Sequence, residues 1–240
     1  MYLCIYSNML RIECLIENTL FMNDSVNPHR KWNDEKSILE MRKNVLSGPG
    51  KEVASFIASL PNFEECHKMI DFAGNIGYYS EAIIEKNQDL YSYVFDLPEV
   101  CNMASTLRSR NNVSDRIIYN GFDFNAGETF GEEYDLFFIS NFLYRYNEKE
   151  DLKNFLKKVN ASMKRGGWFV SNHKATVSEE ERQSHLVSVK NGSKVPLHYL
   201  DENMLKEALS EAGFEFFVKQ ECCSSSSFPT LLLAARKVNS

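Results

Sequence analysis

The sequence lacks the features that mark several large functional classes. No apolar run in its 240 residues approaches the roughly 20 residues that a membrane-spanning helix needs. Lys and Arg number 27 against 33 Asp and Glu, so the net charge is −6 and no basic face for a nucleic acid is expected. The first 21 residues lack a basic leader and a small-residue cleavage site, so we expect a cytoplasmic protein without membrane contact.

The cysteines show no pattern typical of a disulfide framework or a metal site. None of the six has Cys-x-x-Cys spacing, and the adjacent Cys222 and Cys223 cannot form an ordinary disulfide. Cys66-His67 has no further ligands nearby in the sequence. We therefore expect reduced thiols and no metal.

Helical and extended patterns alternate along most of the chain. The expected helices cover residues 8–22, 34–47, 51–60, 77–87, 98–110, 148–163 and 201–212, and the expected strands cover residues 69–73, 91–96, 116–120, 134–140, 168–172, 214–221 and 230–237. This order predicts an α/β fold with a Rossmann-like, doubly wound, seven-stranded sheet that is mostly parallel. The last two strands have no helix between them, so the final strand should be antiparallel. We expect a short helical N-terminal segment at residues 1–60, followed by the sheet domain at residues 61–240.

The turn after the first strand is the most informative segment. Asp71 ends an apolar strand, and the sequence then runs through Ala73, Gly74, Asn75 and Gly77 before a helix opens. A strand, a glycine turn and a helix hold the phosphates or sugars of nucleoside cofactors, because glycines let the backbone approach the ligand. Ala73 and Asn75 stand where glycines are usual.

Ligands in such sheets lie beyond the carboxyl ends of the strands, so the residues after each later strand are also candidates. These residues are Asp96 and Leu97 after the second strand, Gly121, Phe122, Asp123 and Phe124 after the third, and Ser140 and Asn141 after the fourth. Each also has a purely structural interpretation: Asp96 as a helix cap, Asp123 as a turn residue, and the two phenylalanines as core. Their joint order favours a nucleoside cofactor.

The sequence and order of these motifs resemble those of the class I S-adenosylmethionine-dependent methyltransferases. Within this class they resemble the small-molecule O-methyltransferases of the caffeic acid and acetylserotonin type. The residues that carry the resemblance are Asp71–Gly77, Asp96-Leu97-Pro98, Gly121–Phe124, the Tyr134-Asp135-Leu136 step, Lys164–Gly167 and the final strand Leu231–Lys237. The resemblance covers about residues 35–238, and a sheet that closes with an antiparallel strand is characteristic of these methyltransferases.

The resemblance implies roles for individual residues. Asp71, Gly74 and Gly77 would shape the methionine side of an S-adenosylmethionine pocket, and Asp96 would bind the ribose. Asp123 and Phe124 would flank the adenine. Ser140 falls where the family often has a lysine near the cofactor.

The chain departs from the family pattern at the catalytic position. The family usually has a His-Asp-Trp-like triplet after the fourth strand, and its histidine takes the proton from the substrate hydroxyl. Here the triplet is Tyr144-Arg145-Tyr146. A phenol with an unperturbed pKa of about 10 is a poor base near neutral pH. His173 is a substitute candidate, with a surface histidine as the alternative, and His198 is a weaker one.

The family also carries a longer N-terminal segment that dimerises and closes the substrate pocket. We therefore expect residues 1–60 to be a remnant of that lid and dimerisation segment, with the polar stretch 174–200 or a partner as the alternative sources of a lid, and a homodimer or a partner subunit stays open. The predicted function is methyl transfer from S-adenosylmethionine to a small molecule, most readily at oxygen of a hydroxyl or carboxylate. The alternatives are a cofactor-binding protein without methyl transfer, and a methyltransferase acting at N, C or S.

Overall fold

A computed structural model of the chain describes residues 35–111, 113–123, 129–146, 148–173, 200–222 and 230–238. The chain divides into two compact units, residues 1–41 and 42–240. The helix expected at residues 8–22 and His198 lie outside the described residues. Helix α2 (Glu35–Ser47) crosses the division between the units, and all other described elements belong to the second unit.

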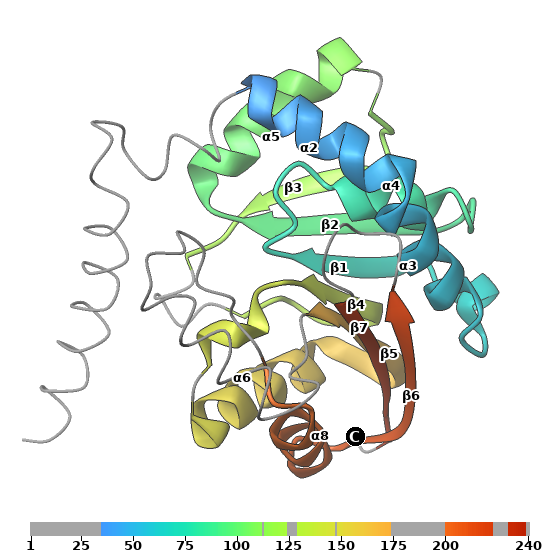
Figure 1. The fold of residues 1–240 in the computed structure, drawn as a ribbon, viewed down its shortest axis with the longest axis vertical. Coiled ribbons are helices and arrows are strands. Elements are labelled where there is room, and N and C mark those ends of the chain that lie inside the picture. The colour runs from blue at the N-terminus through green and yellow to red at the C-terminus, as the bar shows by residue number, and fades with distance from the viewer. Residues whose placement is uncertain are drawn as a thin grey trace, which may run out of the picture. The chain divides into compact units, whose positions relative to one another are not determined.

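The second unit is built on one seven-stranded sheet (Figure 1). Its strands are β1 (Lys68–Phe72), β2 (Tyr91–Asp96), β3 (Ile117–Gly121), β4 (Tyr134–Ser140), β5 (Met163–His173), β6 (Phe214–Cys222) and β7 (Thr230–Lys237), in the order β3-β2-β1-β4-β5-β7-β6. Strand β7 is antiparallel to both of its neighbours, whereas β1 to β5 pair in parallel. The predicted Rossmann-like sheet and its antiparallel closing strand are confirmed.

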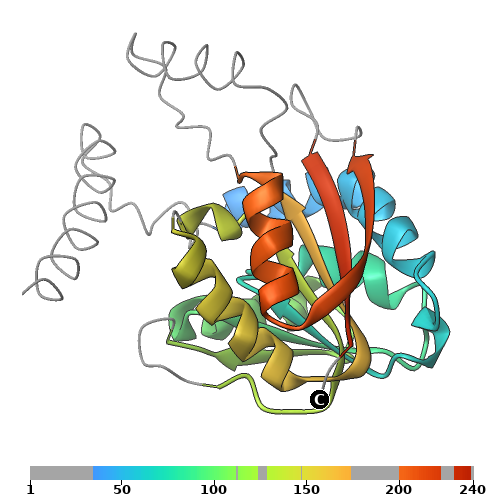
Figure 2. The ribbon, with the colours of Figure 1, turned by 90° about the horizontal axis from the view of Figure 1, so that it is seen from below.

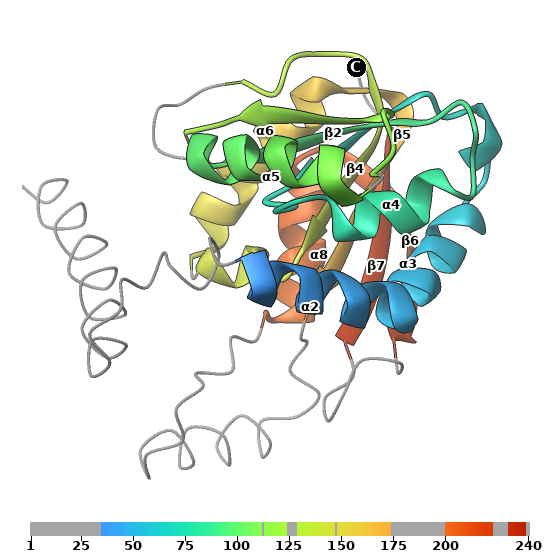
Figure 3. The ribbon, with the colours of Figure 1, turned by 90° about the horizontal axis from the view of Figure 1, so that it is seen from above.

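Helices cover both faces of the sheet. On one face lie α3 (Pro49–Ala58), α4 (Tyr78–Ile84) and α5 (Pro98–Asn111), and on the other lie α6 (Lys149–Ser162) and α8 (Glu202–Glu211) (Figures 1 and 3). Short 3-10 helices follow α3 and β4, namely η2 (Phe63–Glu65) and η3 (Leu143–Arg145). Helix α3 shares the core of this unit, while the lid role expected of residues 1–60 stays a prediction.

Two hydrophobic cores, one on each face, hold the layers together. Successive strand residues point to opposite faces, so Ile70 packs in the core below α6 and α8 while Met69 packs in the core below α3 and α4. Burial on both faces explains why Phe137, Phe138 and Ile139 can be consecutive apolar residues in β4. Because β1 to β5 run in the same direction, their carboxyl ends all lie at the same end of the sheet, the carboxyl edge.

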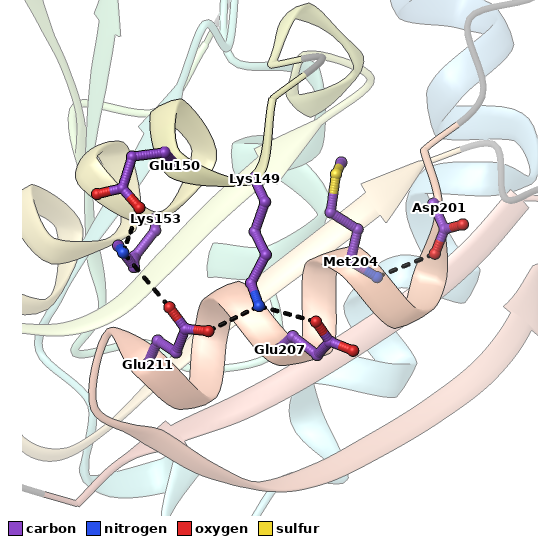
Figure 4. A network of polar contacts seen from close by, with 7 residues as sticks. All are labelled: Lys149, Glu150, Lys153, Asp201, Met204, Glu207 and Glu211. Atoms are coloured by element: carbon purple, nitrogen blue, oxygen red, sulfur yellow. Dashed lines mark hydrogen bonds and ion pairs between the residues drawn. The ribbon is translucent and has the colours of Figure 1, made fainter.

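Helices α6 and α8 lie side by side on their face of the sheet (Figure 2). Lys149 Nζ lies 2.8 Å from Glu207 Oε2 and 2.7 Å from Glu211 Oε1, so one ammonium joins the two helices (Figure 4). Asp201 starts α8 as predicted, because its carboxylate accepts the N–H of Met204 at 2.9 Å. The exposed ion pairs stabilise little, so the apolar core carries this contact.

Three boundaries differ from the sequence-based expectation. Strand β5 begins at Met163 and not at residue 168, because residues 164–167 form a bulge inside the strand, with Gly166 at φ +81°. Helix α4 ends at Ile84, three residues early. His173 is the last residue of β5 and not a loop residue beyond it.

A buried asparagine joins the segment before β1 to the loop between α4 and β2. Asn87 Nδ2 donates to the carbonyls of Phe63 and Cys66, each at 2.9 Å, and its Oδ1 accepts the N–H of Asp89 at 2.9 Å. Both chains that lead into the parallel β1–β2 pair therefore depend on one side chain.

We predict that Asn87→Ala lowers the free energy of unfolding by about 2–4 kcal/mol, because it leaves buried carbonyl groups without a donor. The neighbouring exposed residue supplies a matched control, Gln88→Ala, which should stay within about 0.5 kcal/mol of the parent protein. Urea unfolding measures both variants. Equal stability of the two would show that the Asn87 contacts do not hold the loop.

Candidate cofactor and active site

The turn after β1 is held in a conformation that favours glycine. Ala73 and Asn75 both have φ +54°, and Gly77 has φ +78°. Asparagine tolerates this left-handed region, whereas alanine pays about 1–2 kcal/mol for it. The two positions that depart from the glycine pattern are thus places where the backbone does need positive φ, and such strain typically occurs at ligand sites.

Asp71 lies beneath this turn and supports it. Its side chain is 1% exposed, and Ser80 Oγ donates to its Oδ2 at 2.6 Å. A Cβ on Gly74 would lie 2.5 Å from Asp71 Cγ, so no other residue fits there without moving the carboxyl group. Burial raises the pKa of Asp71 to about 7. These contacts support a role in holding the turn, and the role of Asp71 on the methionine side of a cofactor stays a prediction.

Asp96 connects the end of β2 to the same turn. Its Oδ2 accepts the N–H of Asn75 and its Oδ1 accepts the N–H of Leu97, both at 2.8 Å. Burial raises the pKa of this carboxyl group and outweighs the two hydrogen bonds, which lower it. Each carboxylate oxygen has more than one acceptor site, so Asp96 retains capacity for the two hydroxyls of a ribose. The contact to Leu97 also fits the helix-cap interpretation.

The residues after β3 have mixed surroundings. A Cβ on Gly121 would lie 3.2 Å from Pro98 Cα, so this strand end packs closely against the start of α5. Phe122 is buried, with its ring centroid 5.1 Å from that of Phe130 and 5.8 Å from that of Phe72. These contacts place Phe122 in the aromatic core, as its structural interpretation had it, and a contact of Phe122 with the cofactor stays a prediction. Asp123 is exposed, and Phe124 lies outside the described residues.

The residues after β4 contact a group that the sequence analysis did not single out. Asn172 Nδ2 donates to Ser140 Oγ at 3.2 Å and to the Tyr79 hydroxyl at 3.3 Å. The backbone carbonyl of Asn172 accepts the N–H of Asn141 at 2.8 Å. Asn172 is buried, and within the described residues its Oδ1 has no hydrogen-bond partner. The strand-end rule, applied to the fifth strand as well, would have found it.

The two catalytic candidates lie at the ends of β4 and β5. Tyr144 is the central residue of η3, which begins three residues after the end of β4. His173 is 3% exposed, its Nδ1 lies 3.1 Å from Ser171 Oγ, and its Nε2 has no partner among the residues described. The surface-histidine interpretation is therefore wrong. Burial lowers the pKa of His173 to about 4, so the ring is neutral at neutral pH and weakly basic.

Other possible sites are sparse in the part of the chain that the structure describes. Surface hollows occur between α6 and α8 and at the opposite edge of the sheet, around Cys66, Asp135 and Arg236, and neither reaches the Ala73–Gly77 turn. Within that part, no group of three His, Cys, Asp or Glu residues could hold a metal ion. No described helix is long and apolar enough to cross a membrane.

Known proteins share this sequence pattern and this sheet. The sequence profile of a family described as an O-methyltransferase domain matches residues 33–214. An uncharacterized protein of Methanocaldococcus jannaschii is 28% identical over 142 residues, which are 59% of this chain and 34% of that protein. The chain therefore spans about a third of this curated relative.

Solved structures with the same fold include two methyltransferases. Human N-acetylserotonin methyltransferase in complex with S-adenosylmethionine has a TM-score of 0.64 and 20% identity, over 88% of this chain and 58% of that one. An O-methyltransferase family 2 protein from Planctomyces limnophilus in complex with apigenin has a TM-score of 0.66 and 17% identity, over 93% of this chain and 66% of that one. With its profile match over three quarters of the sequence, the chain belongs to the O-methyltransferase domain family.

Proposed function

We propose that the protein binds S-adenosylmethionine and transfers its methyl group to an oxygen of a small molecule. The observation that carries this proposal is the direct hydrogen bond from the Asn75 N–H to the Asp96 carboxylate, which joins the left-handed turn after β1 to the acid at the end of β2. Family membership and the ligand in the human N-acetylserotonin methyltransferase structure support it.

In this proposal each part of the carboxyl edge of the sheet has one task. The turn Ala73–Gly77 faces the methionine side of the cofactor, and Asp96 with Leu97 receives the ribose. Gly121 to Phe124 lie on the adenine side, while Ser140 and Asn141 follow β4, which pairs with β1. Asn172, buried beside Ser140 with a free acceptor atom among the described residues, is an added candidate for this side of the pocket.

S-adenosylmethionine supplies an electrophilic methyl group on a sulfonium, so transfer to an acceptor hydroxyl would leave S-adenosylhomocysteine and one proton. The chain must orient the acceptor, which provides much of the acceleration, and must hold or pass on the proton. Tyr144 and His173 are the residues proposed for the second task. Neutral His173 can accept a proton, but its pKa of about 4 makes it a weak base for a hydroxyl of ordinary acidity.

The low basicity of the two proposed catalytic residues supports a second candidate function. In it the protein binds the cofactor without methyl transfer and serves a partner subunit. The specific observation that favours it is the tyrosine at position 144 together with the low pKa of the buried His173. The reaction at nitrogen, carbon or sulfur instead of oxygen has no comparable support, because the matching family is an O-methyltransferase domain.

The cofactor proposal predicts a strong effect at Asp96. Titration calorimetry with S-adenosylhomocysteine should show binding, and Asp96→Asn should weaken it about 10- to 100-fold, because hydrogen bonds to the charged carboxylate are lost. Asp89→Asn, at an exposed carboxylate just before β2, is the matched control and should leave the affinity unchanged. Absence of heat at millimolar ligand would refute the cofactor, and an equal affinity of the Asp96 variant would refute its assigned contact.

The catalytic proposal predicts that Tyr144→Phe or His173→Gln slows methyl transfer about 100-fold or more while S-adenosylhomocysteine still binds, because removal of a general base lowers kcat. Transfer of a radiolabelled methyl group to a panel of phenols and carboxylic acids, in single turnover, measures it. Unchanged rates in both variants would remove these residues from the mechanism. A parent protein that binds the cofactor and transfers no methyl group would favour the binding-protein function.

A further inference from the structure

A chain of ring contacts leads from the cofactor turn to the segment after β4. The ring centroid of Phe142 lies 5.2 Å from that of Phe72, with the planes at 85°. Phe72 directly precedes Ala73, the first residue of the turn. Phe142 therefore packs against the residue that leads into the turn proposed for the methyl donor.

The guanidinium of Arg145 lies over the Phe142 ring. Its Cζ is 5.2 Å from the centroid of the Phe142 ring, and the Arg145 N–H donates to the Phe142 carbonyl at 3.1 Å. On the other side of the segment, Tyr146 stacks on Phe155 with 4.9 Å between centroids and 23° between planes. The backbone that carries Arg145 is thus fixed at both ends by aromatic contacts.

Arg145 has no carboxylate of its own in the part of the chain that the structure describes. Other cations there do: Arg42 pairs with Glu81 at 2.5 Å, and Lys164 pairs with Asp135 at 2.7 Å. The Arg145 side chain is exposed, and the chain as a whole has a net charge of −6. Among the described residues, the Arg145 guanidinium is therefore exposed without an acidic partner, near the carboxyl ends of β1 and β4.

The chemistry of such a group selects its ligand. A guanidinium stacked on an aromatic face keeps its N–H donors in a planar fork, which matches the two oxygens of a carboxylate. The ring beneath it restricts the rotation of the side chain and so lowers the entropy lost when the pair forms.

We propose that the acceptor carries a carboxylate, which pairs with Arg145, so that this arginine determines specificity for anionic acceptors. The proposal rests on the proposed methyl-transfer function, since it assigns the acceptor side of that same site. The competing interpretation is a solvated arginine that only covers Phe142, and the test below separates the two.

The test compares acceptors that differ in charge alone. Hydroxybenzoates, hydroxycinnamates and indole carboxylates are titrated by calorimetry, each beside its own amide, into the protein with and without S-adenosylhomocysteine. The parent protein should bind at least one carboxylate about tenfold or more tightly than its amide. Arg145→Gln should abolish that preference, and Arg145→Lys should restore part of it.

Two controls separate this proposal from the proposed function. Arg165→Gln removes an exposed arginine at the opposite edge of the sheet and should keep the carboxylate preference. Binding of S-adenosylhomocysteine is measured in every variant and should not change in Arg145→Gln. A parent protein that does not bind S-adenosylhomocysteine would refute the proposed cofactor and would leave the carboxylate preference to be judged on its own. No preference for any carboxylate over its amide, or a preference that survives in Arg145→Gln, would overturn the assignment of Arg145.

Discussion

The carboxyl group of Asp71, buried beneath the turn after β1, is the constraint on which the site depends. It accepts a hydrogen bond from Ser80 and fills the space where a side chain on Gly74 would stand. The turn passes over it with Ala73 and Asn75 at positive φ. Burial removes much of the solvation of the ionised Asp71 carboxylate, which raises its pKa. The site therefore contains an unfavourable buried charge in addition to the unfavourable backbone conformation of the turn.

The parallel sheet converts this local constraint into a binding edge. The pairing of β1 with β2 aligns Phe72 with Phe95, so the residue after Phe95, Asp96, reaches the Asn75 N–H. On the other side of β1, β4 delivers the segment that contains Phe142, whose ring contacts Phe72. The acid proposed for the ribose and the arginine proposed for the acceptor thus flank the turn from its two neighbouring strands.

The sequence predicts the sheet well because its signals are local: apolar periodicity, Gly and Pro stops, and an acid near the end of each of the first three strands. The sequence-based prediction fails where contacts between strands that are distant in the sequence determine the surroundings of a residue. His173 is buried because β7 pairs Leu231 with it, and Phe122 is core because Phe130 and Phe72 meet its ring. Residues 164–167 form a bulge within β5, because β4 pairs with β5 both before and after them. The residues at the ends of β1 and β2 were predicted, and the same strand-end rule points to Asn172, but its contact with Ser140 across β4 and β5 is visible only in the structure.

The most direct test of the account is a crystal structure of the protein in complex with S-adenosylhomocysteine. The account predicts that both ribose hydroxyls lie within hydrogen-bonding distance of the Asp96 carboxylate and that Ala73 and Asn75 keep positive φ. It also predicts that the thioether sulfur lies on the side of the turn that faces the segment after β4. A ligand bound away from Asp96, or a turn that relaxes to negative φ on binding, would contradict it.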